Sequence, residues 1–316
     1  MDIDYLLFLQ DFRNSIGDAW TPFMLWISHF ATAYLMVFPA FIYWCIDKKK
    51  GLFILSSSVV SVAVNSIIKL TACVYRPWVR DPRIEPAEEA LAESTGYSFP
   101  SGHTSTSAPI YTGIAISFWK KSKIPAVICF VMLALTMFSR NYLGVHTPQD
   151  VIAGLIIGLA SLYGVHRLFL YLEKYPEKED LFLLTGALIS VAAIIYISVK
   201  PYPMDYLNGE LLADPARLKI DGYKDLGLLL ALCIGRYLEK RFVGFKEAGL
   251  NPRGILISLA GLIPLLIITK LLSKPLDGLF GVYFGGMLSR MLLILLIIVL
   301  WPAVIKMVTG ENREAS

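Results

Sequence analysis

The sequence FPSGHTSTSAPIYTGIAISFW, residues 99–119, joins a Pro-Ser-Gly-His turn to a long apolar run. Ser and Gly favour the start of a helix, where unpaired backbone N–H groups and the positive end of the helix dipole can bind an anion. His103 stands beside these groups and can donate a proton. The same turn is also typical of a plain helix start, so its meaning depends on the sequence around it.

The composition is that of an integral membrane protein. Of the 316 residues, 56% are apolar and 17% are charged, whereas the apolar share of soluble domains is ~45–50%. The net charge of +4 is small and the basic residues lie in short loops, so no nucleic-acid partner is expected. The four cysteines lie singly in apolar stretches, which predicts neither disulfides nor a cysteine-bound metal. The acidic N-terminus lacks the basic region of a cleavable signal peptide.

Several runs are apolar and long enough to cross a hydrocarbon core of ~30 Å, which takes ~20 helical residues. They cover residues 21–45, 52–75, 104–119, 124–142, 148–171, 181–199, 224–238, 254–272 and 287–305. The predicted fold class is therefore all-α, a polytopic transmembrane helix bundle of about nine spans.

Three regions are expected along the chain. Residues 1–19 should hold a short helix in the membrane interface, because Leu and Phe alternate there with Asp and Arg at helical spacing. Residues 20–180 should form the core that carries all the motifs. Residues 181–316 should add accessory transmembrane spans and a cytoplasmic tail.

The basic loops predict the orientation of the bundle. These loops are 48–50, 120–123, 167–178, 236–253 and the C-terminal tail, and short loops rich in Lys and Arg stay in the cytoplasm. The N-terminus, the polar connections 77–99 and 200–223, and the motifs should then face the periplasm, the cell exterior or an organelle lumen.

A first motif, Lys69-x6-Arg76-Pro77, precedes the turn. Seven residues are two helical turns, so both cations are expected on one face at the end of a helix that Pro77 terminates. A lysine within a membrane span usually faces a polar cavity or a partner. Snorkelling to the interface is the alternative.

A second motif, Ser139-Arg140-x5-His146-x3-Asp150, follows the turn and straddles the connection between two spans. Thr147 is expected to cap the second of these helices, with Pro148 as its first residue. Asp150 then lies one turn from His146, where its carboxylate can accept from the imidazole Nδ1–H and leave Nε2 as a nucleophile.

Together, these two motifs and Pro100-Ser101-Gly102-His103 closely resemble the signature of the type-2 phosphatidic acid phosphatase superfamily, which also includes vanadium haloperoxidases. The resemblance implies a membrane phosphatase core of five to six helices. It also implies that His146 attacks phosphorus to form a phosphohistidine, that Asp150 orients it, and that His103 protonates the leaving alkoxide and then activates water. The residues implied to hold the phosphoryl oxygens are Lys69, Arg76, Ser101, Gly102 and Arg140. No cofactor and no metal are implied.

The resulting hypothesis is a metal-independent phosphatase that hydrolyses a lipid phosphate or pyrophosphate monoester, with a membrane lipid as its partner. A lipid phosphotransferase with the same intermediate and a non-enzymatic lipid-binding relative are the alternatives. A haloperoxidase is least expected, because the family examples are water-soluble. Arg290, early in the last apolar run, is a candidate for head-group contact or for snorkelling. The substrate and the oligomeric state do not follow from the sequence.

Overall fold

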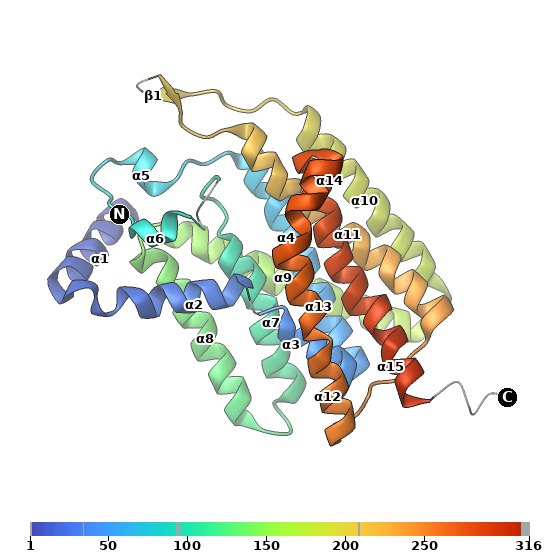
Figure 1. Ribbon diagram of the computed structural model, residues 1–316. Coiled ribbons are helices and arrows are strands. Elements are labelled where there is room, and N and C mark those ends of the chain that lie inside the picture. The colour runs from blue at the N-terminus through green and yellow to red at the C-terminus, as the bar shows by residue number, and fades with distance from the viewer. Residues whose placement is uncertain (1, 34, 93, 95, 208, 311–316) are drawn as a thin grey trace.

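The computed structural model describes residues 2–33, 35–92, 94, 96–207 and 209–310. It confirms the predicted all-α class (Figure 1). Within the described residues, the only strands are β1 (Tyr206–Leu207) and β2 (Glu210–Leu211), which pair as a small antiparallel hairpin.

Four helices surround the motif segments. They are α4 (Lys48–Ala72), α7 (Gly102–Phe118), α8 (Lys123–Tyr142) and α9 (Pro148–Lys174), and α7 packs against the other three. Glycines permit the close approach of α9 to α7. A Cβ atom on Gly154 would come within 2.6 Å of the Ser101 carbonyl oxygen, and one on Gly158 within 2.7 Å of the Ala108 side chain.

The N-terminal segment folds as α1 (Asp2–Ile16), a 3-10 turn (Gly17–Ala19), α2 (Thr21–Ala33), α3 (Val37–Phe41) and a π-helical turn (Ile42–Ile46). The predicted span 21–45 is not one straight helix, since Thr21–Thr32 and Val37–Ile46 are bent by 45° relative to each other, as in a broken span or a re-entrant loop. Figure 1 shows α2 lying across α7 and α8, with which it is in contact. The connection from α4 to α7 contains the short helices α5 (Pro77–Arg80) and α6 (Glu88–Leu91).

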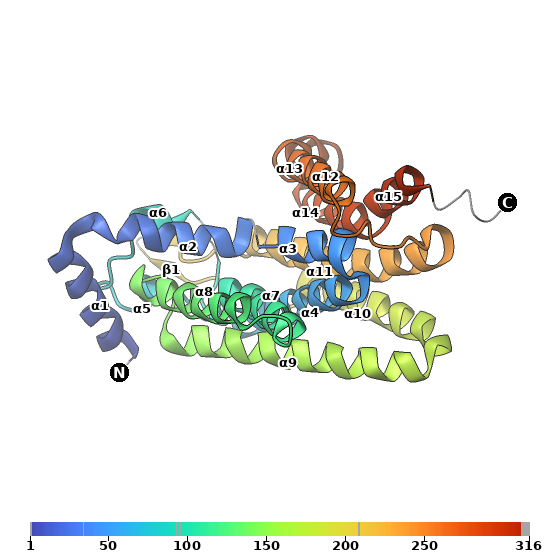
Figure 2. The same cartoon turned by 90° about the horizontal axis from the view of Figure 1, so that it is seen from below.

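The C-terminal half forms a second group of helices. A 3-10 turn (Pro176–Lys178), α10 (Glu179–Val199), α11 (Pro215–Leu238) and a π-helical turn (Glu239–Val243) precede α12 (Pro252–Ala260), α13 (Leu262–Ile267) and a second π-helical turn (Ile268–Leu272). Next come α14 (Ser273–Leu295), a further π-helical turn (Leu296–Leu300) and α15 (Trp301–Thr309). The helices α12–α15 and α9 lie on opposite sides of the bundle (Figure 2).

Helix α14 reverses direction at Gly281, whose φ of 76° and ψ of 158° are not helical. Ser273 and Ser289, which are equally far from Gly281 in sequence, are joined by a hydrogen bond of 2.9 Å. A Cβ atom on Gly285 would come within 2.5 Å of the Asp277 backbone. The two arms therefore pack as a tight helical hairpin, and two glycines make it possible.

The predicted number of nine spans is not confirmed. Among the described residues, five helices are long and apolar enough to cross a membrane, or six if the bent α2–α3 pair counts as one span. Of the other predicted spans, α7 has 17 residues and α11 carries several charged residues in its first half. The apolar helical segment Pro252–Ile267 is also short. The architecture is that expected of a multi-pass membrane protein.

The basic loops meet at the end of the bundle opposite the β-hairpin (Figure 1). Buried Glu239 accepts from Lys48 at 2.6 Å and from Arg236 at 2.5 Å, and Arg236 also donates to Glu179 at 2.8 Å. These ion pairs connect α4, α10 and α11. The sequence-based grouping of the basic loops on one side agrees with this arrangement.

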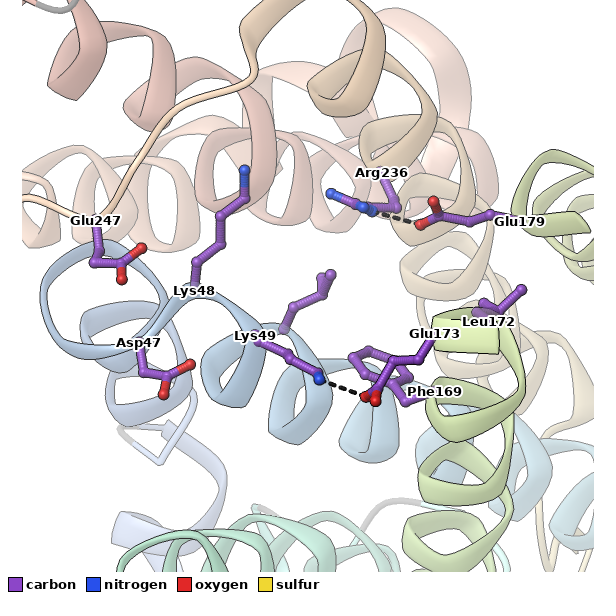
Figure 3. Close-up of a pocket in the computed structure, with 10 residues that line it drawn as sticks. Asp47, Lys48, Lys49, Phe169, Leu172, Glu173, Glu179, Arg236 and Glu247 are labelled. Atoms are coloured by element: carbon purple, nitrogen blue, oxygen red, sulfur yellow. Dashed lines mark hydrogen bonds and ion pairs between the residues drawn. The ribbon is translucent and has the colours of Figure 1, made fainter. Parts of the chain in front are cut away.

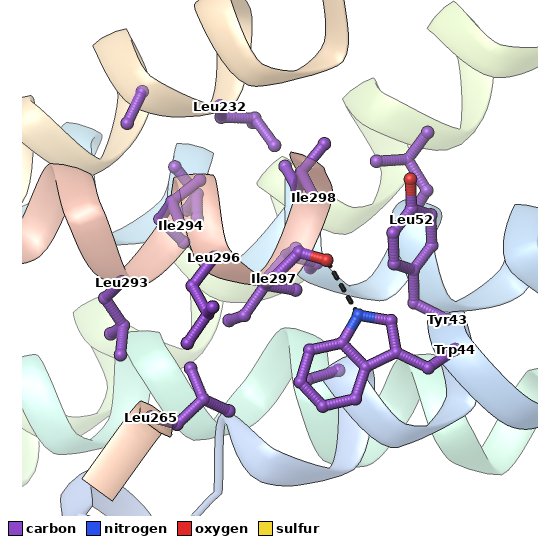
Figure 4. Close-up of a cluster of buried hydrophobic side chains, with 14 of the residues drawn as sticks. Tyr43, Trp44, Leu52, Leu232, Leu265, Leu293, Ile294, Leu296, Ile297 and Ile298 are labelled. Carbon is purple, nitrogen blue, oxygen red and sulfur yellow. Dashed lines mark hydrogen bonds between the residues drawn. The ribbon is translucent and has the colours of Figure 1, made fainter. Parts of the chain in front are cut away.

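A buried apolar cluster ties the first half of the chain to the last helices (Figure 4). Trp44 is fully buried in it, and its indole N–H donates to the Ile297 carbonyl at 2.7 Å. The contact spans more than 250 positions of sequence, so it joins the N-terminal segment to the helices after residue 250.

We expect Trp44→Ala to lower the free energy of unfolding by about 3–5 kcal/mol, because it leaves a large cavity in this cluster. Trp44→Phe should cost less, since it loses mainly the hydrogen bond to Ile297. Denaturant unfolding in detergent measures both. The matched control is Trp119→Ala, because Trp119 is 45% exposed, and an equal loss there would contradict the prediction.

Candidate active site

The three motifs converge on one cavity of about 190 Å³. Five motif residues line it, namely Lys69, Arg76, Gly102, His103 and His146. They come from α4, the connection after it, the start of α7 and the connection between α8 and α9. Residues far apart in the chain thus face one small volume.

His146 lies between an acid and a base. Its Nδ1 is 3.4 Å from Asp150 Oδ2, and its Nε2 is 3.0 Å from Nη1 of Arg76. A guanidinium can only donate, so Nε2 must be the unprotonated nitrogen and Nδ1 must carry the hydrogen. This is the tautomer predicted from the sequence, with the nucleophilic nitrogen directed toward the cation.

The carboxylate of Asp150 is held by more than the imidazole. Its Oδ2 accepts from the Ser98 hydroxyl at 2.5 Å and from the Thr147 backbone N–H at 2.8 Å. Thr147 caps α9 as predicted, and Pro148 is the first helical residue. Ser98 was missed, because nothing in its local sequence predicts a contact with a residue 52 positions away.

The structure corrects the prediction that Lys69 and Arg76 lie on one helix that ends at Pro77. Helix α4 ends at Ala72, and Cys73 follows in the left-handed conformation with φ 50°. Pro77 begins α5 rather than terminating α4. The two cations are therefore not on one helix face, but both still reach the cavity.

The two cations also organise the backbone around the cavity. Lys69 Nζ donates to the carbonyl oxygens of Tyr97 at 2.9 Å and Pro100 at 2.6 Å. Arg76 donates to the carbonyl oxygens of Gly96 at 2.8 Å and Val145 at 2.9 Å. These contacts hold the turn before α7 against the end of α4.

Ser101 caps α7 as predicted, with its hydroxyl oxygen accepting from Thr104. The Ser101 backbone N–H donates to the Asp150 carbonyl at 2.9 Å, and the residue is fully buried. Gly102 and His103 follow it on the cavity wall, and His103 is 7% exposed. The helix start thus presents His103 to the cavity, whereas Ser101 lies behind it.

Arg140 is set back from the cavity wall. It is 1% exposed, and its guanidinium donates to Ser28 Oγ and, at 3.0 Å, to Ser94 Oγ. Its carbonyl oxygen accepts from the backbone N–H of His146 at 3.2 Å. In this conformation Arg140 supports the connection that carries His146.

The opposite wall of the cavity comes from the C-terminal half. Arg290 of α14 lies there, together with Asp221, Lys224 and Asp225 of α11. The three α11 residues were missed, although Lys224 and Asp225 at the start of the predicted span 224–238 were a signal for a polar function.

Burial and the positive charges of Arg76, Arg140 and Lys69 hold the pKa of His146 well below its ordinary value of 6.5. Each of these effects disfavours the imidazolium form. The imidazole is therefore neutral at neutral pH, as a nucleophile must be.

A larger cavity of about 480 Å³ lies at the other end of the bundle (Figure 3). Most charged residues that line it form ion pairs with one another, such as Lys49 with Glu173 and Arg236 with Glu179. This cavity contains no motif residue. Elsewhere in the described part of the chain, no three His, Cys, Asp or Glu side chains come together as a possible metal site.

Comparison with known proteins identifies the central segment. The family model of the PAP2 superfamily matches residues 50–174. The chain is 31% identical over 112 residues to phosphatidylglycerophosphatase B of Bacillus subtilis, covering 33% of this chain and 54% of the relative. It is 28% identical over 134 residues to undecaprenyl-diphosphatase of Sulfolobus acidocaldarius, covering 42% and 58%.

A third similar protein is lipid A 4'-phosphatase of Porphyromonas gingivalis, 27% identical over 144 residues that cover 43% of this chain and 59% of the relative. The chain thus spans a little over half the length of each of these relatives. No solved structure gives a significant match.

We expect Nε2 of His146 to stay unprotonated when the pH is lowered from about 7.5 to about 6, because burial and the neighbouring positive charges hold the pKa of its imidazole well below the ordinary value. Nitrogen-15 NMR of histidine-labelled protein in detergent measures this, with His146→Gln assigning the signal. Arg76→Met removes one positive charge and should raise the pKa. An unchanged titration in Arg76→Met would show that this charge is not a cause.

Proposed function

We propose that this chain is a membrane phosphatase. The premise is that residues 50–174 are a PAP2 superfamily domain, as the motifs predicted. The chain hydrolyses a lipid phosphate or diphosphate ester through a phosphohistidine on His146. The observation that carries the proposal is the pair of contacts made by the His146 imidazole. Its Nδ1 contacts Asp150, and its Nε2 contacts Arg76, which lines the cavity together with His146. The phosphatase names of the relatives support the same reaction class.

In the first step, the phosphoryl oxygens accept hydrogen bonds from Arg76 and Lys69. The hydrogen bond from Arg76 to Nε2 of His146 is thereby broken, and the Nε2 lone pair attacks phosphorus. Cations around the equatorial oxygens offset the charge that a phosphoryl group carries in the transition state. The His146–phosphorus bond forms, the bond from phosphorus to the alcohol oxygen breaks, and Asp150 stabilises the positive charge on the ring.

His103 serves both steps as acid and base. It gives its proton to the departing alkoxide and then takes a proton from water, which attacks the phosphohistidine. The products are the alcohol and inorganic phosphate, and His146 returns to its neutral form. Charge compensation in this scheme comes from Lys69 and Arg76, so it needs no metal ion.

We expect His146→Ala to lower turnover by about 10⁴-fold or more, because it removes the nucleophile. His103→Ala should spare more activity on diphosphates than on monoesters, since a phosphate leaving group needs less protonation. Inorganic phosphate release from a panel of lipid phosphates measures both, and vanadate should inhibit the wild type. If His103→Ala lowered the turnover of diphosphates and monoesters equally, the assignment of His103 as the general acid would be wrong.

The matched control is His166→Ala. The His166 ring packs beside Phe53, with the ring centroids 5.9 Å apart, and it does not line the catalytic cavity, so activity should persist. Transfer of phosphate to a second lipid with no release of inorganic phosphate would replace the phosphatase by a phosphotransferase. Absence of both reactions would favour a lipid-binding relative.

The orientation of the site is also part of the proposal. The basic loops gather at the end of the bundle opposite the β-hairpin (Figure 1), and such loops stay cytoplasmic. The cavity would then open on the non-cytoplasmic face, where the phosphate head of a lipid in the outer leaflet can enter.

Cysteine labelling tests this orientation in a variant whose four native cysteines are replaced by serine. Asp205→Cys, near the β-hairpin, should react with a membrane-impermeant maleimide in intact cells. Lys121→Cys, in a basic loop, should react only after lysis. The reverse pattern would invert the proposed topology.

A further inference from the structure

We propose that the C-terminal helices build a second binding region in the catalytic cavity, which binds a hydroxyl- or amine-bearing alcohol group of the substrate. Four charged residues form it, Asp221, Lys224, Asp225 and Arg290, here called the head-group wall. The inference rests on the proposed function, because it concerns the part of the ester that leaves. All four residues lie beyond residue 174, where the family match ends.

Three residues of the head-group wall share one face of α11. Asp221, Lys224 and Asp225 lie three and four positions apart, the spacing of neighbours on a helix surface. Lys224 Nζ is 3.5 Å from Asp221 Oδ1. Asp225 lines the cavity together with Ser66 of α4, and it interacts electrostatically with Arg290 of α14. The wall is therefore a connected set of groups held by three helices.

A close helix contact brings this wall to the catalytic residues. Gly222 faces α4 and α10, and a Cβ atom there would come within 2.6 Å of Leu70 Cδ1 and 2.7 Å of Ile197 Cδ1. Glycine thus lets α11 approach α4 at the level of the cavity. Asp225 also interacts electrostatically with Lys69. The cavity has a volume of only about 190 Å³. A molecule whose phosphoryl group is bound there must therefore also contact the head-group wall.

The chemistry of the wall defines what that molecule presents. Two carboxylates and two cations give a formal charge of zero, so the wall does not select for a second anion. The carboxylates accept from a hydroxyl or an ammonium group, and the cations donate to a hydroxyl oxygen. A bare hydrocarbon chain would offer these groups no further hydrogen-bond partner. A site built for a polar group rejects the analogue that lacks it much more strongly than an apolar site rejects a size change.

The experiment compares two phosphate esters of equal chain length. Sphingosine 1-phosphate carries an ammonium and a hydroxyl group close to the ester, whereas octadecyl phosphate carries neither. The wild type should favour the first by about 10- to 100-fold in kcat/KM. Asp225→Asn and Arg290→Met should each reduce this ratio about 10-fold, because each substitution lowers kcat/KM mainly for sphingosine 1-phosphate.

Matched controls remove the same charges outside the cavity. Asp205→Asn alters an exposed carboxylate on the same side of the protein, and Arg217→Met alters an arginine of α11 whose side chain is 86% exposed. Both controls should leave the two rates unchanged. A ratio near one in the wild type, or an unchanged ratio in Asp225→Asn and Arg290→Met, would overturn the head-group wall.

Failure of the proposed function gives a different result. If neither ester releases phosphate, the phosphatase proposal falls, but binding can still be measured. Both esters are then titrated into His146→Ala protein, and their binding affinities are compared. The melting temperature of this variant is compared with that of the wild type to show that it is folded. Preferential binding of sphingosine 1-phosphate that is lost in His146→Ala/Asp225→Asn supports the wall, and equal binding of the two esters overturns it.

Discussion

The site depends on one residue in the first turn of α9. Asp150 accepts from Ser98 and Thr147 through its carboxylate, and from the Ser101 backbone through its carbonyl. Its Oδ2 also lies 3.4 Å from His146 Nδ1. His146 and the turn before α7 are therefore positioned by the same few atoms. The positive end of the α9 dipole favours a carboxylate at this place. A single helix start thus supplies both the electrostatics and the geometry of the catalytic end.

The parts that sequence predicted well follow local rules. Thr147 with Pro148 and Ser101 with Gly102 are helix starts whose caps act within one turn, and the spacing of His146 and Asp150 is one turn of chain. Such relations need no knowledge of the rest of the fold. The motif residues that line the cavity could be named for this reason.

What sequence could not predict depends on contacts between distant segments. The end of α4 at Ala72 places Cys73 in a left-handed conformation that a cysteine side chain does not favour. Lys69 binds carbonyl oxygens of a turn that lies about 30 residues later. An apolar run also looks the same whether it crosses a membrane or folds back, as the chain does at Gly281. The number of crossings that the apolar runs predict is therefore not confirmed by the structure.

Helix α11 links the two ends of the molecule. Arg236, near the C-terminal end of this helix, is held by Glu179 and Glu239. Asp225 lies 11 residues, or ~17 Å, nearer the N-terminus and lines the cavity. Because a helix hardly compresses along its axis, these ion pairs and the Asp225 carboxylate keep a fixed spacing along α11. Any shift of the ion pairs along the helix axis is therefore transmitted to the carboxylate in the cavity.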